Sequence, residues 1–501
     1  MTNSQLIAPI VVLGLALGAL AQPAKGPHQI ELERHRDAPV LDALIGQGGR
    51  PSMPSIARAR RLASQNRVVF GYLPYWIDAD YYRNLDFDLL THVSAFSLEV
   101  EPDGTIGNAH GWPWTALVDS AHAHGVYVIV TATLFGDSEV LSVIGDKNHR
   151  QTFFRQIRDR IIEGGADGVN IDFEGPGANG WPALINDFMA ELTDFLHREI
   201  PGCQVSFAAP PVDWAGRWDF PGLADSCDYL FIMGYAFAGS WSQESGPTAP
   251  LTGGWRNITT TLQGASDYGE ATRRSPEKLI LGVPYYGCQW KTAGPQARNA
   301  TVEFVNYPTV LQTLPGAAVH GRMWDEFSST PWYRYQEEGQ WYQVWYDDPA
   351  SLGLKFDLAL QANLLGVGMW ALGYEGDRRE PWDLLAAKMG ARVPATAVSE
   401  TPQARDRGLV QNYPNPFNGA THISYDIDGA GSVIVQIFDA GGRAILPWRA
   451  YHGESGRYGW WWNGGDGRGQ PVASGVYFYR LVFTGADGQS WRQTRRMVLV
   501  R

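Results

Sequence analysis

Short apolar runs alternate with longer amphipathic segments over residues 67–392 of the chain. The eight runs are Val68–Tyr75, His92–Leu98, Tyr127–Leu134, Gly168–Glu174, Gln204–Ala209, Tyr229–Tyr235, Lys278–Val283 and Gly366–Trp370. Segments between them, such as Asn148–Gly164 and Trp181–Ile200, carry apolar residues at helical spacing. Strands that alternate with helices predict an α/β fold, and eight repeats predict closure into a (β/α)8 TIM barrel. An open, doubly wound sheet is the alternative that the pattern leaves.

Two further regions depart from this alternation. About 80 residues (286–365) separate the seventh and eighth runs, and Trp332–Tyr335 and Trp341–Trp345 within them predict strands of an α+β insertion beside the barrel mouth. Residues 393–408 lack periodicity and contain Pro, Ala, Thr and Ser, which predicts a linker. Residues 409–501 alternate between apolar and polar without helical spacing, which predicts a small all-β immunoglobulin-like sandwich.

The amino-terminal residues 1–21 have the features of a secretory signal peptide. An apolar run, Ile7–Ala21, is too short for a comfortable membrane span and ends in Ala19-Leu20-Ala21, which predicts cleavage after Ala21. The leader carries no Lys or Arg, so a buried helix or a retained anchor is the alternative. Residues 22–66 are polar and Arg-rich, and we expect a flexible segment or short helices there. The protein is therefore expected to be secreted or held at the cell surface.

Composition narrows the class of partner. The net charge is -12, with 40 Lys and Arg against 52 Asp and Glu, so nucleic acid is a poor candidate partner. The chain has 20 Trp and 22 Tyr, whose flat rings suit carbohydrate surfaces, although large aromatic cores would also use them. Three cysteines are too few for a disulfide framework, and their pairing stays open.

The strongest chemical signal is the segment Asp167–Glu174. Side chains alternate across a strand, so Asn170, Asp172 and Glu174 would all point into the barrel. Two carboxylates in a barrel interior incur a large desolvation cost unless they are paired and used, although a structural polar ladder is the alternative. Glu174 is last, at the carboxyl end of the strand, where barrel enzymes keep their active sites.

Asp172 and Glu174 lie one pleat repeat apart, about 7 Å at the backbone. Like-charge repulsion would raise the pKa of Glu174 and keep it protonated, as the general acid of glycoside hydrolysis requires. No third carboxylate on this strand is placed to act as nucleophile. The nucleophile would come from another strand or from the substrate.

The segment Asp167–Glu174 resembles the DxxDxDxE signature of glycoside hydrolase family 18, the chitinase-like barrels. Gly71–Trp76 resembles the first strand of that family, Met233-Gly234-Tyr235 its sixth-strand Met-x-Tyr and Gly366–Trp370 its eighth-strand Trp. Within the family, the chain looks most like spore-cortex and related enzymes that act on peptidoglycan or chitin.

The resemblance implies a retaining reaction in which the 2-acetamido oxygen of the substrate attacks the anomeric carbon. Glu174 would then be the acid and later the base. Asp172 would orient the acetamido group and stabilise the oxazolinium cation, and Asn170 would hold Asp172. Tyr235 would bind the acetamido carbonyl, and Trp370 would form the floor under the sugar.

Three positions depart from the family pattern. Asn170 replaces an Asp, Ala236 stands where many members carry Asp, and Thr131–Leu134 lacks the usual Ser-x-Gly-Gly. These departures bear on turnover rate and pH optimum more than on the identity of the acid. Further residues proposed for substrate binding are Tyr72, Met233, Trp76, Trp214, Tyr285 and Trp290. We expect no metal and no cofactor, because the histidines lack metal-ligand spacing and no Gly-rich phosphate loop follows a strand.

The last 90 or so residues resemble a second group of domains. Gln411–Asn418, Pro471–Tyr479 and Arg495–Arg501 look like the flagellar-hook-capping-type (FlgD-like) immunoglobulin fold and the C-terminal sorting domains of type IX secretion. The resemblance does not decide between these two roles. Trp460–Trp462 could bind polysaccharide, but packing within the sandwich is favoured.

The sequence thus predicts a secreted, monomeric glycosidase that cleaves β-1,4 bonds at N-acetylglucosamine in chitin, chito-oligosaccharide or peptidoglycan strands. Secretion machinery would be a second partner, through the C-terminal domain. The alternative is a non-catalytic, lectin-like protein that binds chitin or peptidoglycan on the same barrel. The presence of an acid at Glu174 favours catalysis.

Overall fold

The fold is described from a computed structural model. It describes residues 25–46, 67–175, 181–214, 216–254, 256–297, 303–306 and 308–390, and further along the chain 408–409, 412, 415, 417, 421–452, 456–462, 464–466, 470–485 and 488–500. The chain divides into two compact units, Met1–Pro394 and Ala395–Arg501. The predicted signal peptide and most of the predicted linker lie outside the described residues.

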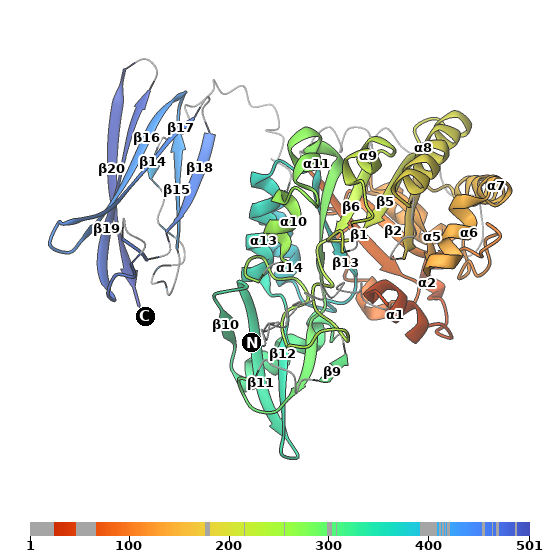
Figure 1. The fold of residues 1–501 in the computed structure, drawn as a ribbon, viewed down its shortest axis with the longest axis horizontal. Coiled ribbons are helices and arrows are strands. Elements are labelled where there is room, and N and C mark those ends of the chain that lie inside the picture. Colours follow the sequence, from red (N-terminus) through yellow and green to blue (C-terminus); the bar gives the residue numbers. More distant parts are fainter. Residues whose placement is uncertain are drawn as a thin grey trace, which may run out of the picture. The chain divides into compact units, whose positions relative to one another are not determined.

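Eight parallel strands close into a barrel, as the sequence predicted (Figure 1). The strands are β1 Val68–Pro74, β2 His92–Glu99, β3 Tyr127–Phe135, β4 Gly168–Glu174, β5 Gln204–Ala209, β6 Tyr229–Met233, β7 Leu279–Pro284 and β13 Gly366–Trp370. Their order around the barrel is β1-β13-β7-β6-β5-β4-β3-β2, so β13 and β1 close the ring. Strand β6 ends at Met233, which leaves Tyr235 just beyond it, in the loop at the carboxyl end.

Helices follow the strands and cover the outside of the barrel. They are α4 Ala79–Tyr82, α5 Thr115–Ala123, α6 Asp137–Gly145, α7 Lys147–Gly164, α8 Trp181–Glu199, α9 Phe220–Asp225, α10 Ile258–Gln263, α11 Gly269–Arg274, the 3-10 turn η1 Pro276–Lys278, α13 Pro349–Gln361 and α14 Glu380–Met389. Asp146 caps the start of helix α7, because its carboxylate accepts from the backbone N–H groups of Asn148 and His149. No helix in the described part of the chain is long and apolar enough to cross a membrane.

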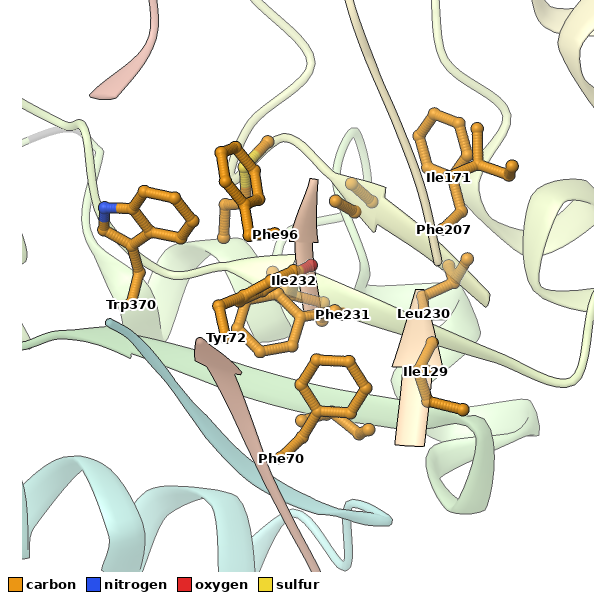
Figure 2. Packing of buried hydrophobic residues seen from close by; sticks show 14 of the residues in the cluster. Phe70, Tyr72, Phe96, Ile129, Ile171, Phe207, Leu230, Phe231, Ile232 and Trp370 are labelled. Carbon is orange, nitrogen blue, oxygen red and sulfur yellow. The ribbon is translucent and has the colours of Figure 1, made fainter. Parts of the chain in front are cut away.

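Aromatic rings fill the barrel interior (Figure 2). The ring of Phe231 lies 5.4 Å from that of Phe70 and 4.9 Å from that of Tyr72. Two glycines make room for it, since a Cβ on Gly282 or Gly368 would come within 2.3 or 2.4 Å of the Phe231 ring. This aromatic layer forms the base on which the residues at the carboxyl end of the barrel stand.

The predicted insertion after β7 is a five-stranded sheet with one helix. Its strands are β8 Cys288–Thr292, β9 Glu303–Asn306, β10 Met323–Asp325, β11 Thr330–Glu337 and β12 Gln340–Trp345, in the order β10-β11-β12-β8-β9, and its helix is α12 Val310–His320. The antiparallel pair β11 and β12 stacks Trp332 on Trp345, with ring centroids 5.0 Å apart. All three cysteines of the chain are buried free thiols.

Residues 22–66 were expected to form a flexible segment or short helices, and residues 25–46 are the part of this segment that the structure describes. Residues 25–46 form two short helices, α1 Pro27–Arg34 and α2 Asp42–Ile45, drawn in red beside the barrel in Figure 1. Leu32 and Leu44 are buried against the barrel unit. Burial of these two apolar side chains helps to offset the conformational entropy that is lost when the segment becomes ordered.

The second unit is a two-sheet β structure, described by itself. Its strands are β14 Gly408–Leu409, β15 Thr421–Ile427, β16 Gly431–Asp439, β17 Ala444–His452, β18 Gly456–Trp462, β19 Gly475–Gly485 and β20 Ser490–Leu499. The sheets have the orders β14-β15-β18 and β17-β16-β19-β20. Trp462 is buried between them and its indole donates to the Gly465 carbonyl at 2.8 Å, which agrees with the packing role favoured for this tryptophan.

Candidate active site

Strand β4 carries the polar ladder that the sequence predicted. Its outward side chain Phe173 packs on Phe153 of α7 and Phe188 of α8, with centroids 5.7 Å away in each case. The opposite face therefore points into the barrel, where Asn170 and Asp172 are fully buried. Glu174 ends the strand and keeps a side chain 16% exposed. The alternation of the strand thus aims one amide and two carboxylates at the barrel axis.

The two carboxylates are close enough to influence one another. One oxygen of Asp172 and one of Glu174 lie within 4.8 Å. Burial, and then the charge of Asp172, raise the pKa of Glu174 well above its ordinary 4.5. The repulsion anticipated from the sequence is present, but desolvation is the larger cause. A glutamic acid in this setting keeps its proton at a pH where an exposed one would have lost it.

Asn170 is held by neighbours other than Asp172. The Tyr72 hydroxyl donates to its Oδ1 at 2.7 Å, and its amide nitrogen donates to Ser206 Oγ at 2.9 Å. Oδ1 of Asp172 has no hydrogen-bond partner among the described residues. Among the described residues no hydrogen bond joins Asn170 to Asp172, and Tyr72 and Ser206 hold the amide instead.

The loop after β6 brings a hydroxyl to the same place. Tyr235 is fully buried, and burial raises its pKa well above 10, so the phenol stays protonated. Met233 and Ala236 line the cavity beside Glu174. Ala236 has a φ of 63°, in the left-handed region where a residue with a Cβ is strained.

Trp370 was predicted to form the floor under the sugar, and it lies beside the cluster of aromatic rings at the carboxyl end of the barrel. Trp370, the last residue of β13, lies 4.6 Å from Phe96 and 5.5 Å from Tyr72, measured between ring centroids (Figure 2). Its indole nitrogen is buried and has no hydrogen-bond partner among the described residues. Trp370 thus presents an apolar ring at the carboxyl end of the barrel, next to the predicted acid.

The other aromatic residues predicted to bind substrate differ in how far they are buried. Trp76 follows β1 at the barrel mouth and is half-buried. Tyr285 and Trp290 are buried, and the indole of Trp290 donates to the Gly246 carbonyl at 3.0 Å from within the insertion sheet. In this structure neither of these two rings offers a face to a ligand. Trp214 is half-buried and does line the cavity beside Glu174.

A residue that was not singled out in the sequence completes the cluster. His28 of α1 is fully buried, with Nδ1 2.8 Å from Asp172 Oδ2 and Nε2 2.8 Å from the Tyr235 hydroxyl oxygen. Its ring lies 3.9 Å from that of Trp370, and Nδ1 is 3.6 Å from Glu174 Oε1. The sequence held one weak signal, a proline at position 27 that favours the start of a helix just before His28.

Comparison with known protein families agrees with the resemblance seen in the sequence. The model of glycosyl hydrolases family 18 matches residues 69–375, which is more than half of the chain. The chain belongs to this family. It is accordingly a glycosidase, and the match covers β1 through the loop after β13, including every barrel strand that contributes to the cluster.

The chain is similar to proteins whose names describe several glycosidase activities. Human di-N-acetylchitobiase is 30% identical over 309 residues, covering 54% of this chain and 75% of that protein. The putative sporulation-specific glycosylase YdhD of Bacillus subtilis is 25% identical and covers 70% and 82%, respectively. A family 18 chitinase from Cycas revoluta, solved with (GlcNAc)3, superposes with a TM-score of 0.57 at 18% identity, covering 64% and 99%. The last likeness concerns the fold alone.

Among the described residues, one group has ligand atoms close enough to one another to hold a metal ion, and it consists of His28, Asp172 and Glu174. Both ring nitrogens of His28 are already engaged, one by Asp172 and one by Tyr235. A cation would have to break the contact with Asp172 to enter. The arrangement therefore suits proton transfer and hydrogen bonding better than metal ligation.

Proposed function

We propose that this family 18 glycosidase cleaves β-1,4 bonds at N-acetylglucosamine in chitin or peptidoglycan strands, by a retaining reaction assisted by the substrate. The observation that carries the proposal is the placement of Glu174 within 4.8 Å of the fully buried Asp172 at the carboxyl end of β4, where burial and the charge of Asp172 raise the pKa of Glu174. Such a pair separates the roles of proton donor and charge stabiliser between two carboxylates.

Glu174 acts as the general acid. Its carboxyl group donates a proton to the glycosidic oxygen as the bond to the anomeric carbon breaks, which lets the leaving sugar depart as a neutral alcohol. The resulting carboxylate then takes a proton from water as that water attacks. The raised pKa supports this double role, since it brings the acid closer to the pH at which it must work.

The acetamido group of the substrate supplies the nucleophile. Its carbonyl oxygen attacks the anomeric carbon and forms an oxazolinium ring, which water later opens with overall retention. Asp172 accepts a hydrogen bond from the N–H of the acetamido group, and the negative charge of Asp172 stabilises the oxazolinium cation. The Tyr235 hydroxyl donates to the acetamido oxygen, and the ring of Trp370 packs under the apolar face of the sugar.

The substrate class rests on the relatives. Three mammalian proteins among them are di-N-acetylchitobiases, and a cortical fragment-lytic enzyme of Bacillus subtilis is 24% identical over 299 residues. The first name refers to an N-acetylated chitobiose and the second to cortical fragments. We therefore propose chito-oligosaccharides and peptidoglycan strands as the two substrates to compare.

We further propose that the protein is exported. Residues 1–21 have the pattern of a signal peptide, and the C-terminal β unit resembles a sorting domain of type IX secretion. Expression with the native leader and mass determination of the mature protein test this: an exported product should begin at Gln22. A product found only inside the cell, with the leader attached, would contradict it.

The test of the reaction compares wild type with Glu174→Gln on chitotetraose and on purified peptidoglycan. Wild type should release reducing ends from at least one substrate, and the variant should be slower by a factor of about 10²–10⁴. Ligand binding by the variant should persist, because Gln keeps the shape of the side chain. Equal rates in the two proteins would show that Glu174 is not the general acid. Binding without any cleavage by wild type would favour the lectin-like alternative.

A further inference from the structure

The contacts of His28 coincide with those proposed for a bound sugar. Its imidazole joins Asp172 on one nitrogen and the Tyr235 hydroxyl on the other, both at 2.8 Å. Its ring covers Trp370 at a centroid distance of 3.9 Å and an interplanar angle of 33°. An imidazole has an N–H donor and a lone-pair acceptor on opposite edges, as an acetamido group has its N–H and carbonyl. His28 thus makes the hydrogen bonds with Asp172 and Tyr235 that the acetamido group of a substrate would otherwise make.

A second histidine covers a second aromatic residue at the mouth. His35 stacks on Trp76, with ring centroids 4.7 Å apart and planes within 5°. His28 lies in α1 and His35 directly follows its last residue, and the rings of both contact aromatic residues of the barrel unit. Between them Glu31 accepts from the Tyr374 hydroxyl at 2.9 Å. Helix α1 is therefore laid along the rim formed by the loops after β1 and β13.

The start of the helix closes the space above the acid. Gly26 and Pro27 line the cavity that also contains Glu174, Trp214 and Ala236. That cavity measures about 40 Å³, which holds about three water molecules. Binding pockets for small ligands measure about 300 Å³ or more. A sugar ring cannot reach Glu174 while α1 is in this position.

Helix α2 fixes the segment at its other end. Leu44 is fully buried, and the carbonyl of Ile45 accepts from the hydroxyl of Thr115 at the start of α5. The Tyr75 hydroxyl donates to the His35 carbonyl at 2.6 Å, between the two helices. Residues 25–46 are thus held at several points along the carboxyl end of the barrel.

We infer that residues 25–46 are an autoinhibitory segment, which occupies the sugar-binding site and must leave before a glycan with N-acetylated sugars can bind. This inference rests on the proposed function for the identity of the ligand. Segment and glycan compete for Asp172, Tyr235 and Trp370. The apparent affinity for the glycan is then the intrinsic affinity multiplied by the fraction of molecules in the open state.

Two substitutions should open the site by different routes. His28→Ala removes both hydrogen bonds and the ring over Trp370. Gly26→Ala adds a Cβ that would lie 2.1 Å from Glu174 Oε2, a clash that exists only when the segment is bound. Glu33→Ala is the matched control, because Glu33 is on the same helix but exposed, in an ion pair with Lys25. Exposed pairs of this kind contribute little to stability.

Chitotriose binding is measured by calorimetry on the full chain in a Glu174→Gln background. His28→Ala and Gly26→Ala should each bind at least tenfold more tightly than the background protein, and Glu33→Ala should match it. With Glu174 restored, kcat/KM on chitotriose should rise by the same factor. Tighter binding without cleavage would overturn the proposed function and leave the autoinhibition intact.

Hydrogen exchange of residues 27–34 gives a readout that needs no ligand. Exchange in α1 should speed up at least tenfold in His28→Ala and Gly26→Ala but not in Glu33→Ala, because only the first two release the helix. Slow exchange in all variants, or unchanged chitotriose affinity in both His28→Ala and Gly26→Ala, would overturn the inference.

Discussion

Nδ1 of His28 lies 2.8 Å from Oδ2 of Asp172, although the two residues are 144 positions apart in the chain. Asp172 comes from the fourth barrel strand and His28 from a helix that precedes the barrel. The pair joins the proposed charge stabiliser of the reaction to the proposed inhibitory segment. Substrate and segment would therefore compete for a single carboxylate.

The alkaline limb of the pH profile should respond to Asp172. Glu174 must be protonated to act as acid, so kcat/KM falls as pH rises through its pKa, which burial and the Asp172 charge have raised above 4.5. Asp172→Asn removes the charge and leaves the burial. The limb should move to lower pH while kcat also falls, and the pH dependence of kcat/KM on chitotetraose measures the movement. A limb that stays in place would assign the transition to another group.

Glu375 should make the barrel less stable as pH rises. Burial raises its pKa from 4.5 to about 7, while one oxygen accepts from the Gly373 N–H at 2.8 Å. Because the folded pKa exceeds the unfolded one, its contribution is fully present below about pH 4.5 and is lost as pH rises through about 7. Between those values the loss is on the order of 3 kcal/mol.

Glu375→Gln removes this dependence. Denaturant unfolding of the barrel at pH 5 and pH 8 should show the variant gaining on wild type by roughly 3 kcal/mol across that range, whatever their difference at pH 5. Parallel losses in the two proteins would show that Glu375 does not titrate with folding.

Trp290 should matter to stability and not to substrate affinity. Its indole is buried in the insertion sheet and donates to Gly246, so Trp290→Phe loses one hydrogen bond and some packing, at a cost of about 1–3 kcal/mol. KM for chitotetraose should stay within twofold of wild type, while thermal unfolding shifts down. A several-fold rise in KM with unchanged stability would return Trp290 to the substrate site.

The barrel and its polar ladder could be predicted because they depend on local periodicity. Apolar runs at regular intervals specify the strands, and alternation on β4 decides which side chains face inward. Asn170, Asp172 and Glu174 were identified in this way, and the structure aims them inward. Their roles in the reaction remain proposals.

Other features depend on contacts between distant parts of the chain, which periodicity does not encode. Trp290 is an aromatic residue of the type that binds sugars, yet the pairing of β8 with β12 buries it. Asn170 was expected to hold Asp172, but its hydrogen bonds go to Tyr72, which reaches it across the barrel from β1, and to Ser206 on the neighbouring strand β5. His28 stands in a polar segment whose composition suggested flexibility, and only its partners in the barrel reveal its place.

The anomeric form of the first product tests the central claim most directly. Chitotetraose hydrolysis by the His28→Ala protein, followed by proton NMR from the first minute, reports whether the β or the α anomer is released before mutarotation. A substrate-assisted reaction with Glu174 as acid predicts the β anomer first, and no product from His28→Ala with Glu174→Gln. Release of the α anomer first would contradict the mechanism.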